Sequence, residues 1–254
     1  MKVIILGCGT ASGTPRIGDD WGNCDPEEPR NRRMRASILV ETQGKNILID
    51  TSPDLRAQAL DNRITDIDGV LFTHAHADHS SGIDDLRFFA QRKEQGATIP
   101  VHAARDTLGT LQMRFGYLFS QGPDRFYSPV LSARVIEGPF DIAGVPVVPF
   151  EQGHGNISTL GFRFGDFAYS TDVVELSEKA FSSLEGVAVW VVDCLQVEKH
   201  PTHAHLELVL SWISRIRPKR AILTHLSPSL DYSRLTKSVP PGVEVAYDGL
   251  SFNV

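Results

Sequence analysis

The chain has 254 residues, 41% of them hydrophobic, and its formal net charge is -6 with histidine counted as neutral. This length can bury one large hydrophobic core, and we expect a single domain over residues 1–254. The acidic balance argues against a stable nucleic-acid partner, and no apolar run approaches the ~18 to 20 residues of a membrane span, so we expect a cytoplasmic protein without a membrane partner.

Short runs rich in apolar and β-branched residues predict strands along the whole chain. In chain order they are Lys2–Leu6, Ser37–Glu41, Asn46–Asp50, Gly69–Thr73, Pro100–Ala103, Val145–Phe150, Leu160–Phe164, Phe167–Thr171, Val187–Asp193, Arg220–Thr224 and Val243–Tyr247. Helices are expected between them at Pro53–Asp61, Ser81–Gln95, Asp106–Phe119, Leu176–Leu184, His205–Ile216 and Tyr232–Lys237. The stretch from Phe119 to Pro129, "FSQGPDRFYSP", is typical of a surface loop. Sheets covered by helices are the expected architecture.

Four of the predicted strands end in a polar side chain that can bind a metal. These side chains are His74 in "VLFTH", Asp172 in "YSTD", Asp193 in "VWVVD" and His225 in "AILTH". If the strands are neighbours that run the same way, the four side chains lie along one rim of a sheet, where open α/β structures place their ligands.

The stretch "THAHADH" gathers three histidines and an aspartate within six positions. Side chains two apart share a face in extended chain, so His74 and His76 point the same way, whereas Asp78 and His79 turn at the start of the next helix. Imidazole and carboxylate ligands together suit zinc, manganese or iron better than calcium. The alternative is a polar helix start capped by Asp78, but capping does not explain three histidines.

This stretch resembles the HxHxDH signature of the metallo-β-lactamase superfamily, and later motifs follow in that superfamily's order. The resemblance implies an αββα sandwich of two mixed sheets flanked by helices, with two divalent metal ions, zinc or manganese, at the sheet edge. Carried over residue by residue, one ion would be held by His74, His76 and His154 and the other by Asp78, His79 and His225, with Asp172 as the bridge. Asp50 and Asp193 would support these ligands from behind.

Two further segments resemble the phosphodiesterases of this superfamily, above all the PhnP-like cyclic phosphodiesterases. They are the loop "LGCGTASGTPRIG" and the element "HPTHAHLEL". Two cations can supply a bridging hydroxide as the nucleophile, and we expect His203 to protonate the leaving group. The substrate partner would be a small cyclic or nucleotide-like phosphodiester, with Ser12, Arg33 and His200 as weaker candidates for contacts to it.

The sequence also departs from the PhnP-like pattern. A structural zinc site of that group uses several cysteines, whereas only Cys24 stands in the corresponding stretch "WGNCDPEEP" and Pro228 follows where a histidine would close the site. We therefore expect no structural zinc and another physiological ester. The three cysteines are far apart, which argues against a disulfide framework.

Several other interpretations stay open. A tRNA 3′-processing endonuclease shares the metal motifs, although no long inserted arm or net basic balance is visible. A thioesterase or lactamase leaves the Pro-Thr-His element unexplained, and a noncatalytic binding module would have to keep all seven ligands without using them. A dinucleotide-binding protein is disfavoured because Ser12 occupies the third glycine position of the fingerprint. A homodimer is compatible with all of these.

Overall fold

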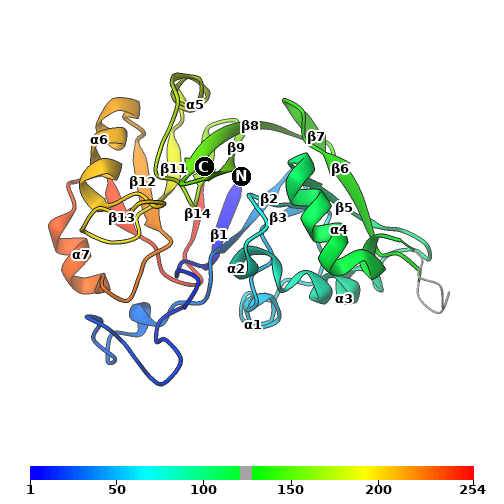
Figure 1. Cartoon of the computed structure of the whole chain (residues 1–254), viewed down its shortest axis with the longest axis horizontal. Coiled ribbons are helices and arrows are strands. Elements are labelled where there is room, and N and C mark those ends of the chain that lie inside the picture. The colour runs from blue at the N-terminus through cyan, green and yellow to red at the C-terminus, as the bar shows by residue number, and fades with distance from the viewer. Residues whose placement is uncertain (121–127) are drawn as a thin grey trace.

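The computed structural model describes residues 1–120 and 128–254, so most of the loop expected between Phe119 and Pro129 lies outside the described residues. Within these ranges, two seven-stranded mixed sheets pack face to face, and helices cover their outer faces (Figure 1). The αββα sandwich expected from the sequence is therefore confirmed. No helix in the described ranges combines the length and apolar character that crossing a membrane requires.

The first sheet is built mainly from the N-terminal half. In spatial order it contains β14 (Ser251–Asn253), β1 (Lys2–Gly7), β2 (Ser37–Thr42), β3 (Lys45–Ile49), β4 (Gly69–Leu71), β5 (Ile99–Ala103) and β6 (Leu131–Val135). Its helices are α1 (Leu55–Asp61), α2 (Ala77–Ser80), α3 (Leu86–Ala90) and α4 (Arg105–Phe119), with a short 3-10 turn at Ile83–Asp85. A second 3-10 turn, Pro29–Asn31, lies against the start of α7. Because β14 pairs with β1, the two ends of the chain lie side by side (Figure 1).

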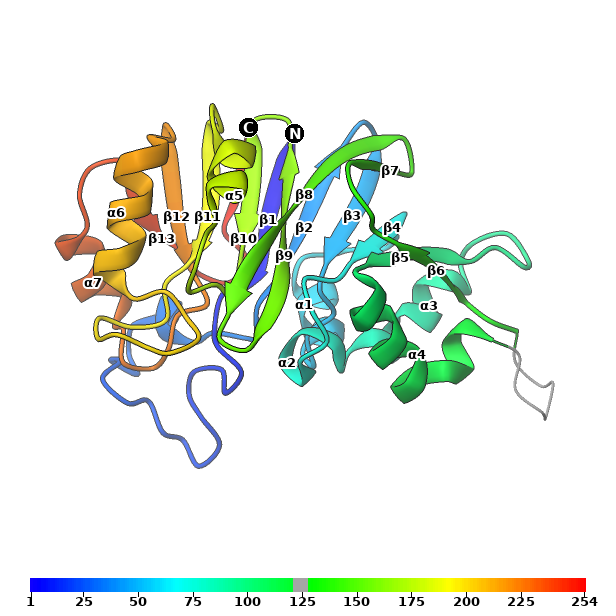
Figure 2. The same cartoon turned by 45° about the horizontal axis from the view of Figure 1, so that its top comes forward.

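The second sheet is built from the C-terminal half. In spatial order it contains β13 (Val243–Val245), β12 (Arg220–Thr224), β11 (Val189–Asp193), β10 (Phe167–Ser170), β9 (Ile157–Phe164), β8 (Val145–His154) and β7 (Phe140–Ile142). The helices α5 (Glu178–Leu184), α6 (Leu206–Ile216) and α7 (Tyr232–Ser238) lie on its outer side (Figure 2). The strands β10 to β13 are parallel, and a long antiparallel hairpin of β8 and β9 extends the sheet.

The strand β1 shows how the sequence divides between the layers. Its residues Val3 and Ile5 enter the core between the two sheets, while Ile4 and Leu6 enter the core beneath α1, α3 and α4. All four side chains are at most 5% exposed. Alternation with a period of two therefore buries both faces of this strand.

Some elements differ from those expected. The three-residue strands β7 and β14 and the edge strand β6 were not predicted, because short edge strands depend on pairing with a neighbour more than on their own composition. The single helix expected at Ser81–Gln95 is replaced by the turn at Ile83–Asp85 and the short helix α3. A further short helix, α2, begins inside the histidine motif itself.

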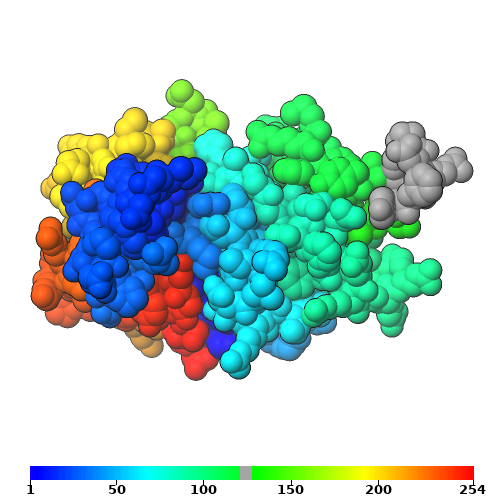
Figure 3. All heavy atoms as spheres, turned by 90° about the horizontal axis from the view of Figure 1, so that it is seen from below, coloured from blue at the N-terminus to red at the C-terminus, as the bar shows by residue number. Residues whose placement is uncertain are grey.

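The irregular segment between β1 and β2 covers one end of the molecule. In Figure 3 it lies against the C-terminal part of the chain, shown in orange and red. Hydrogen bonds hold it there: the Asn31 side-chain amide donates to the Asp231 carboxylate at 2.6 Å, and the Asn23 backbone N–H donates to the Pro228 carbonyl at 2.8 Å. This segment brings the glycine-rich loop after β1 next to the ends of the second sheet.

Candidate active site

The metal-capable strand ends meet at one rim, but they come from both sheets. Asp172, Asp193 and His225 stand at or just after the ends of β10, β11 and β12, which are parallel neighbours as expected. His74 follows β4, which belongs to the other sheet. The expectation of four neighbouring strands is thus wrong for β4, because the rim is shared by the two layers of the sandwich.

A first group of side chains gathers around one oxygen of Asp172. The ligand atoms of His74, His76, His154 and Asp172 all lie within 4.8 Å of one another. His74 reaches this point from the loop after β4, His76 from the position that precedes α2, and His154 from the last residue of β8. Figure 2 shows the end of the β8–β9 hairpin beside α2, which explains how residues 78 positions apart meet.

A second group gathers around the other oxygen of Asp172. The ligand atoms of Asp78, His79, His225 and Asp172 also lie within 4.8 Å of one another. Asp78 and His79 come from α2, and His225 directly follows β12. His225 has a φ of 57° and Asp172 a φ of 53°, a conformation that non-glycine residues rarely adopt and that aims both side chains into the rim.

Asp172 stands between the two groups. Its Oδ1 lies 3.8 Å from Nε2 of His74 and 3.7 Å from Nε2 of His154. Its Oδ2 lies 3.0 Å from Nε2 of His79 and 3.6 Å from Nε2 of His225. Within the described ranges, the buried Nε2 atoms of His74, His79 and His225 make no hydrogen bond of good geometry. Buried imidazole nitrogens that converge without partners fit metal ions, which take that lone pair.

Asp50 holds the histidine loop from behind. Its Oδ1 accepts the backbone N–H of Thr73 at 2.8 Å, and its Oδ2 accepts the Thr73 hydroxyl and lies 2.8 Å from Nδ1 of His79. The Thr73 hydroxyl also lies 2.9 Å from Nδ1 of His74. A single buried carboxylate therefore orients one imidazole directly and a second one through a threonine, as metal-ligating histidines require.

Asp193 supports the other side of the rim. Its Oδ2 lies 2.9 Å from Nδ1 of His203 and accepts the backbone N–H of Val173 at 3.0 Å. The same carboxylate faces His225, with 3.7 Å between Oδ1 and Nδ1. The imidazole of His203 stacks on that of His225 at 4.8 Å between ring centres, and its Nε2 points toward Asp172 at 3.8 Å.

The two groups of imidazoles differ in electrostatics. Burial lowers the pKa of His74 well below its usual value, and burial also lowers the pKa of His154. Burial opposes protonation of His225 too, but the facing carboxylates, first that of Asp172, outweigh it and raise the pKa of His225 to about 9. For Asp172 itself, burial is outweighed by His225 and the neighbouring histidines, which hold its pKa well below the usual range.

Comparison with known proteins agrees with this geometry. The Beta-lactamase superfamily domain matches residues 45–226, which is more than half of the chain. The chain belongs to the metallo-β-lactamase superfamily. A crystal structure of a diphosphatase from the PhnP family superposes with a TM-score of 0.92 at 32% identity and covers 100% of this chain and 97% of that chain. The expected relation of this superfamily member to the PhnP family is therefore confirmed.

Two curated proteins are similar in sequence to this superfamily member over part of their own length. A protein of Porphyromonas gingivalis named octanoyltransferase is 33% identical over an alignment of 255 positions that covers 98% of this chain and 51% of that protein. A ribonuclease Z of Bradyrhizobium diazoefficiens is 30% identical over 139 residues, which are 54% of this chain and 46% of that protein. The chain thus spans about half the length of the curated relatives it matches.

The three residues expected to contact the substrate, Arg33, Ser12 and His200, lie outside both ligand groups. Arg33 is 2% exposed, and its guanidinium donates to the backbone carbonyls of Ser227 at 3.1 Å and Leu230 at 2.7 Å. Arg33 thus connects the N-terminal segment to the loop before α7, so the expectation that it contacts phosphate is wrong.

Ser12 is exposed on the glycine-rich loop, where its hydroxyl donates to the Gly13 carbonyl at 3.0 Å. His200 lines the cleft above the metal rim, with 5.4 Å between its ring centre and that of His203.

Sequence reasoning missed several residues that complete the superfamily site. Thr202 supplies the backbone carbonyl that contacts Nδ1 of His154 at 2.7 Å, and Thr73 bridges Asp50 and His74. Thr10, Ala11, Asn156, Ile157 and Leu195 line the cleft beside the ligands. The position of Thr73 next to His74 was a usable signal, whereas a backbone carbonyl leaves no mark in a sequence.

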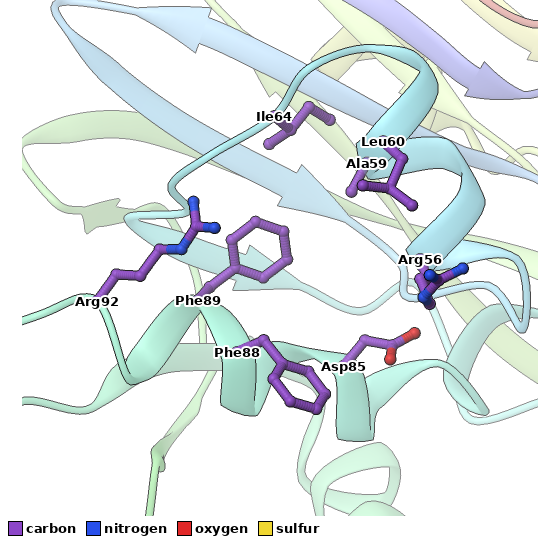
Figure 4. Close-up of a pocket in the computed structure, with 8 residues that line it drawn as sticks. All are labelled: Arg56, Ala59, Leu60, Ile64, Asp85, Phe88, Phe89 and Arg92. Carbon is purple, nitrogen blue, oxygen red and sulfur yellow. The ribbon is translucent and has the colours of Figure 1, made fainter.

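A second hollow lies away from the superfamily site, between α1 and α3 (Figure 4). Its floor is apolar, with Leu60, Ile64 and Phe89, and the guanidinium groups of Arg56 and Arg92 stand toward its two ends. Asp85 is the acidic side chain in its lining, and the hollow contains no histidine from the described ranges. It therefore lacks the converging ligands that distinguish the rim.

Proposed function

We propose that the protein is a phosphodiesterase that uses two divalent metal ions. The observation that supports this most directly is the placement of Asp172, whose two oxygens face two separate groups of imidazoles. Such a carboxylate suits a pair of cations a short distance apart. The first ion would be held by His74, His76 and His154, and the second by Asp78, His79 and His225, with Asp172 shared.

When bound, the ions supply a water of lowered pKa as nucleophile and neutralise the phosphate oxygens during displacement. The protein's own side chains orient the reaction. Asp50 and Asp193 keep imidazole rings in place through their Nδ1 atoms. The Nδ1 atom of His203 contacts the Asp193 carboxylate, so its Nε2 atom faces the ligand groups. From there Nε2 can donate a proton to the leaving oxygen. Asp78 and Asp172 are acidic ligands that carry no such proton.

A second candidate substrate is a diphosphate ester. It is favoured by the 32% identity to a diphosphatase of the PhnP family over nearly the whole of both chains. Both substrates require the same in-line attack at phosphorus, and they differ only in whether an alkoxide or a phosphate leaves. Acyl transfer is not carried over from the Porphyromonas protein, because this chain matches only 51% of it.

The manganese-reconstituted and zinc-reconstituted protein in water enriched in oxygen-18 tests the proposal, with phosphorus NMR of the products after a chelator has removed the metal and with release of free thiol measured for the thioester. The substrates are a ribose cyclic phosphate, a 2′,3′-cyclic nucleotide, an aryl phosphodiester, a dinucleotide diphosphate, a tRNA precursor and a thioester. We expect one of the phosphodiesters or the diphosphate to be cleaved with one oxygen-18 in the phosphate product. Cleavage of the thioester alone, or of the tRNA precursor alone, would contradict a small-molecule phosphodiesterase.

A further inference from the structure

The cleft over the metal rim has two walls of different character. The lining at the ligands consists of Asp and His side chains, and the remaining lining residues, here called the outer wall, are Thr10, Ala11, Asn156, Ile157, Leu195 and Thr202. The cleft has a volume of about 490 Å³ and is open to solvent. A substrate whose phosphate sits at the ligands therefore presents its remaining groups to the outer wall or to solvent.

The outer wall carries no positive charge. Among the described residues that line the cleft there is no lysine or arginine, and the only charged groups besides the histidines are Asp78 and Asp172. Arg33 donates to the backbone carbonyls of Ser227 and Leu230, and Arg114 donates to the Ala75 carbonyl at 2.7 Å. The chain as a whole carries a net charge of -6. A second anionic group on the outer wall would thus meet no counter-charge.

The outer wall does offer apolar surface. Ile157 is 44% exposed at the first position of β9, where it pairs with His154 across the turn of the hairpin. Leu195 is held in place by backbone hydrogen bonds, since its N–H donates to Ala204 and its carbonyl accepts from Ser227. Leu195 is only 8% exposed, so Ile157 offers the larger apolar surface of the two, and covering it with an apolar group of the substrate favours binding.

We infer that the substrate concentrates its negative charge in the one phosphate or diphosphate group at the metal ligands and presents an uncharged, apolar or aromatic group to the outer wall. This inference rests on the proposed function and narrows its substrate class. It excludes oligonucleotides, whose further phosphates would lie on the uncharged wall. Ile157 is the residue that selects the neutral group.

Inhibition of bis(4-nitrophenyl) phosphate hydrolysis tests the inference. Two symmetrical diesters serve as inhibitors, dibenzyl phosphate and bis(4-carboxybenzyl) phosphate, so that either side of the phosphate presents the same group. We expect dibenzyl phosphate to bind the metal-loaded protein at least about tenfold more tightly. Ile157→Arg should reverse this preference, while Ile17→Arg, which adds the same charge at a fully exposed isoleucine outside the cleft lining, should leave it unchanged.

The salt dependence gives an independent readout. Binding of dibenzyl phosphate should change less than about threefold between 50 and 200 mM salt, because no row of phosphates is neutralised by cationic side chains. Equal or tighter inhibition by the carboxylated diester, or an unchanged preference in Ile157→Arg, would overturn the inference while the hydrolysis itself still supports the proposed function. Absence of hydrolysis of every diester by the metal-loaded protein would instead contradict the proposed function.

Discussion

The two ligand groups on either side of Asp172 are built differently. In the first group, His76 is exposed, and the imidazoles of His74 and His154 are oriented by neutral oxygens, the Thr73 hydroxyl and the Thr202 carbonyl. In the second group, His79 and His225 are at most 2% exposed and face the carboxylates of Asp50 and Asp193. The first group includes a solvent-exposed ligand, His76, whereas both imidazoles of the second group are buried.

This difference indicates how tightly each group would hold a cation. A carboxylate on the far nitrogen makes an imidazole a stronger ligand, because it stabilises the positive charge that the ring acquires. A neutral carbonyl or hydroxyl does this less. We therefore expect the second group to bind its ion more tightly, and the first group to exchange its ion more readily with solvent.

Removal of Asp172 should affect both groups at once. Asp172→Ala deletes the oxygens that face His74 and His79, and we expect turnover to fall by roughly a thousandfold or more with loss of bound metal from both positions. Metal content by mass spectrometry and the turnover number check this. Asp166→Ala, an exposed carboxyl in the turn before β10, is the matched control and should keep both. Two retained ions with unchanged turnover in Asp172→Ala would show that Asp172 is not shared.

Removal of His203 should spare the metals and slow the chemistry. His203→Gln takes away the Nε2 that faces the centre, and we expect a roughly hundredfold to ten-thousandfold loss of turnover for a diester with an alkyl leaving group. The loss should be much smaller for a 4-nitrophenyl leaving group, which departs without a proton. Equal losses on both esters would sink the proposed role of His203 as the proton donor.

Local patterns of the sequence were enough to predict much of this molecule. The apolar run of β1 and the run "THAHADH" each lie within a few residues. The first forms a strand as expected, and the second brings His74, His76 and His79 to the rim. Resemblance supplied the more distant partners, such as His154. The strands β7 and β14 escaped prediction because three residues form a strand only when a neighbouring strand is already in place.

The remaining features depend on contacts that no spacing reveals. Arg33 stands in an arginine-rich run, which suggested a phosphate contact. In the structure it is buried and donates to the carbonyls of Ser227 and Leu230, 194 and 197 positions later in the chain. The carboxylate of Asp50 reaches His79 over 29 positions, and the carbonyl of Thr202 reaches His154 over 48. Such partners are set by how the two sheets pack, so they become visible only in the structure.

The support behind each group can be tested separately. Asp50→Asn should weaken metal affinity of the second group by roughly tenfold to a hundredfold, because the carboxylate that contacts His79 becomes neutral. The effect on the first group should be smaller, because His74 contacts Asp50 only through the Thr73 hydroxyl. Thr202→Val should leave the first group nearly unchanged, since the group that contacts His154 is a backbone carbonyl. Competition against a chelator measures both affinities. Equal weakening in the two variants would mean that the Thr202 side chain, and not its backbone carbonyl alone, supports the first group.

A carboxyl outside both groups shows what burial does when no imidazole faces it. Burial raises the pKa of Asp248 to about 7, although its oxygens accept the backbone N–H groups of Cys8 at 3.0 Å and Met34 at 2.6 Å. A raised pKa means that the folded state binds a proton more tightly than the unfolded state, so this contribution to stability is complete below about pH 4 and is lost as the pH rises through about 7.

Asp248 should therefore lower the free energy of unfolding by about 1 kcal/mol between pH 6 and 8. Asp248→Asn should lose this dependence, because an amide does not titrate there. It should also be less stable at both values, since its NH2 group would face one of the two backbone N–H donors. Denaturant unfolding of both proteins at the two pH values measures the difference. An identical pH dependence in the variant would assign the titration to another group, such as the imidazoles of the rim, and would remove the contrast between Asp248 and the acidic ligand Asp172.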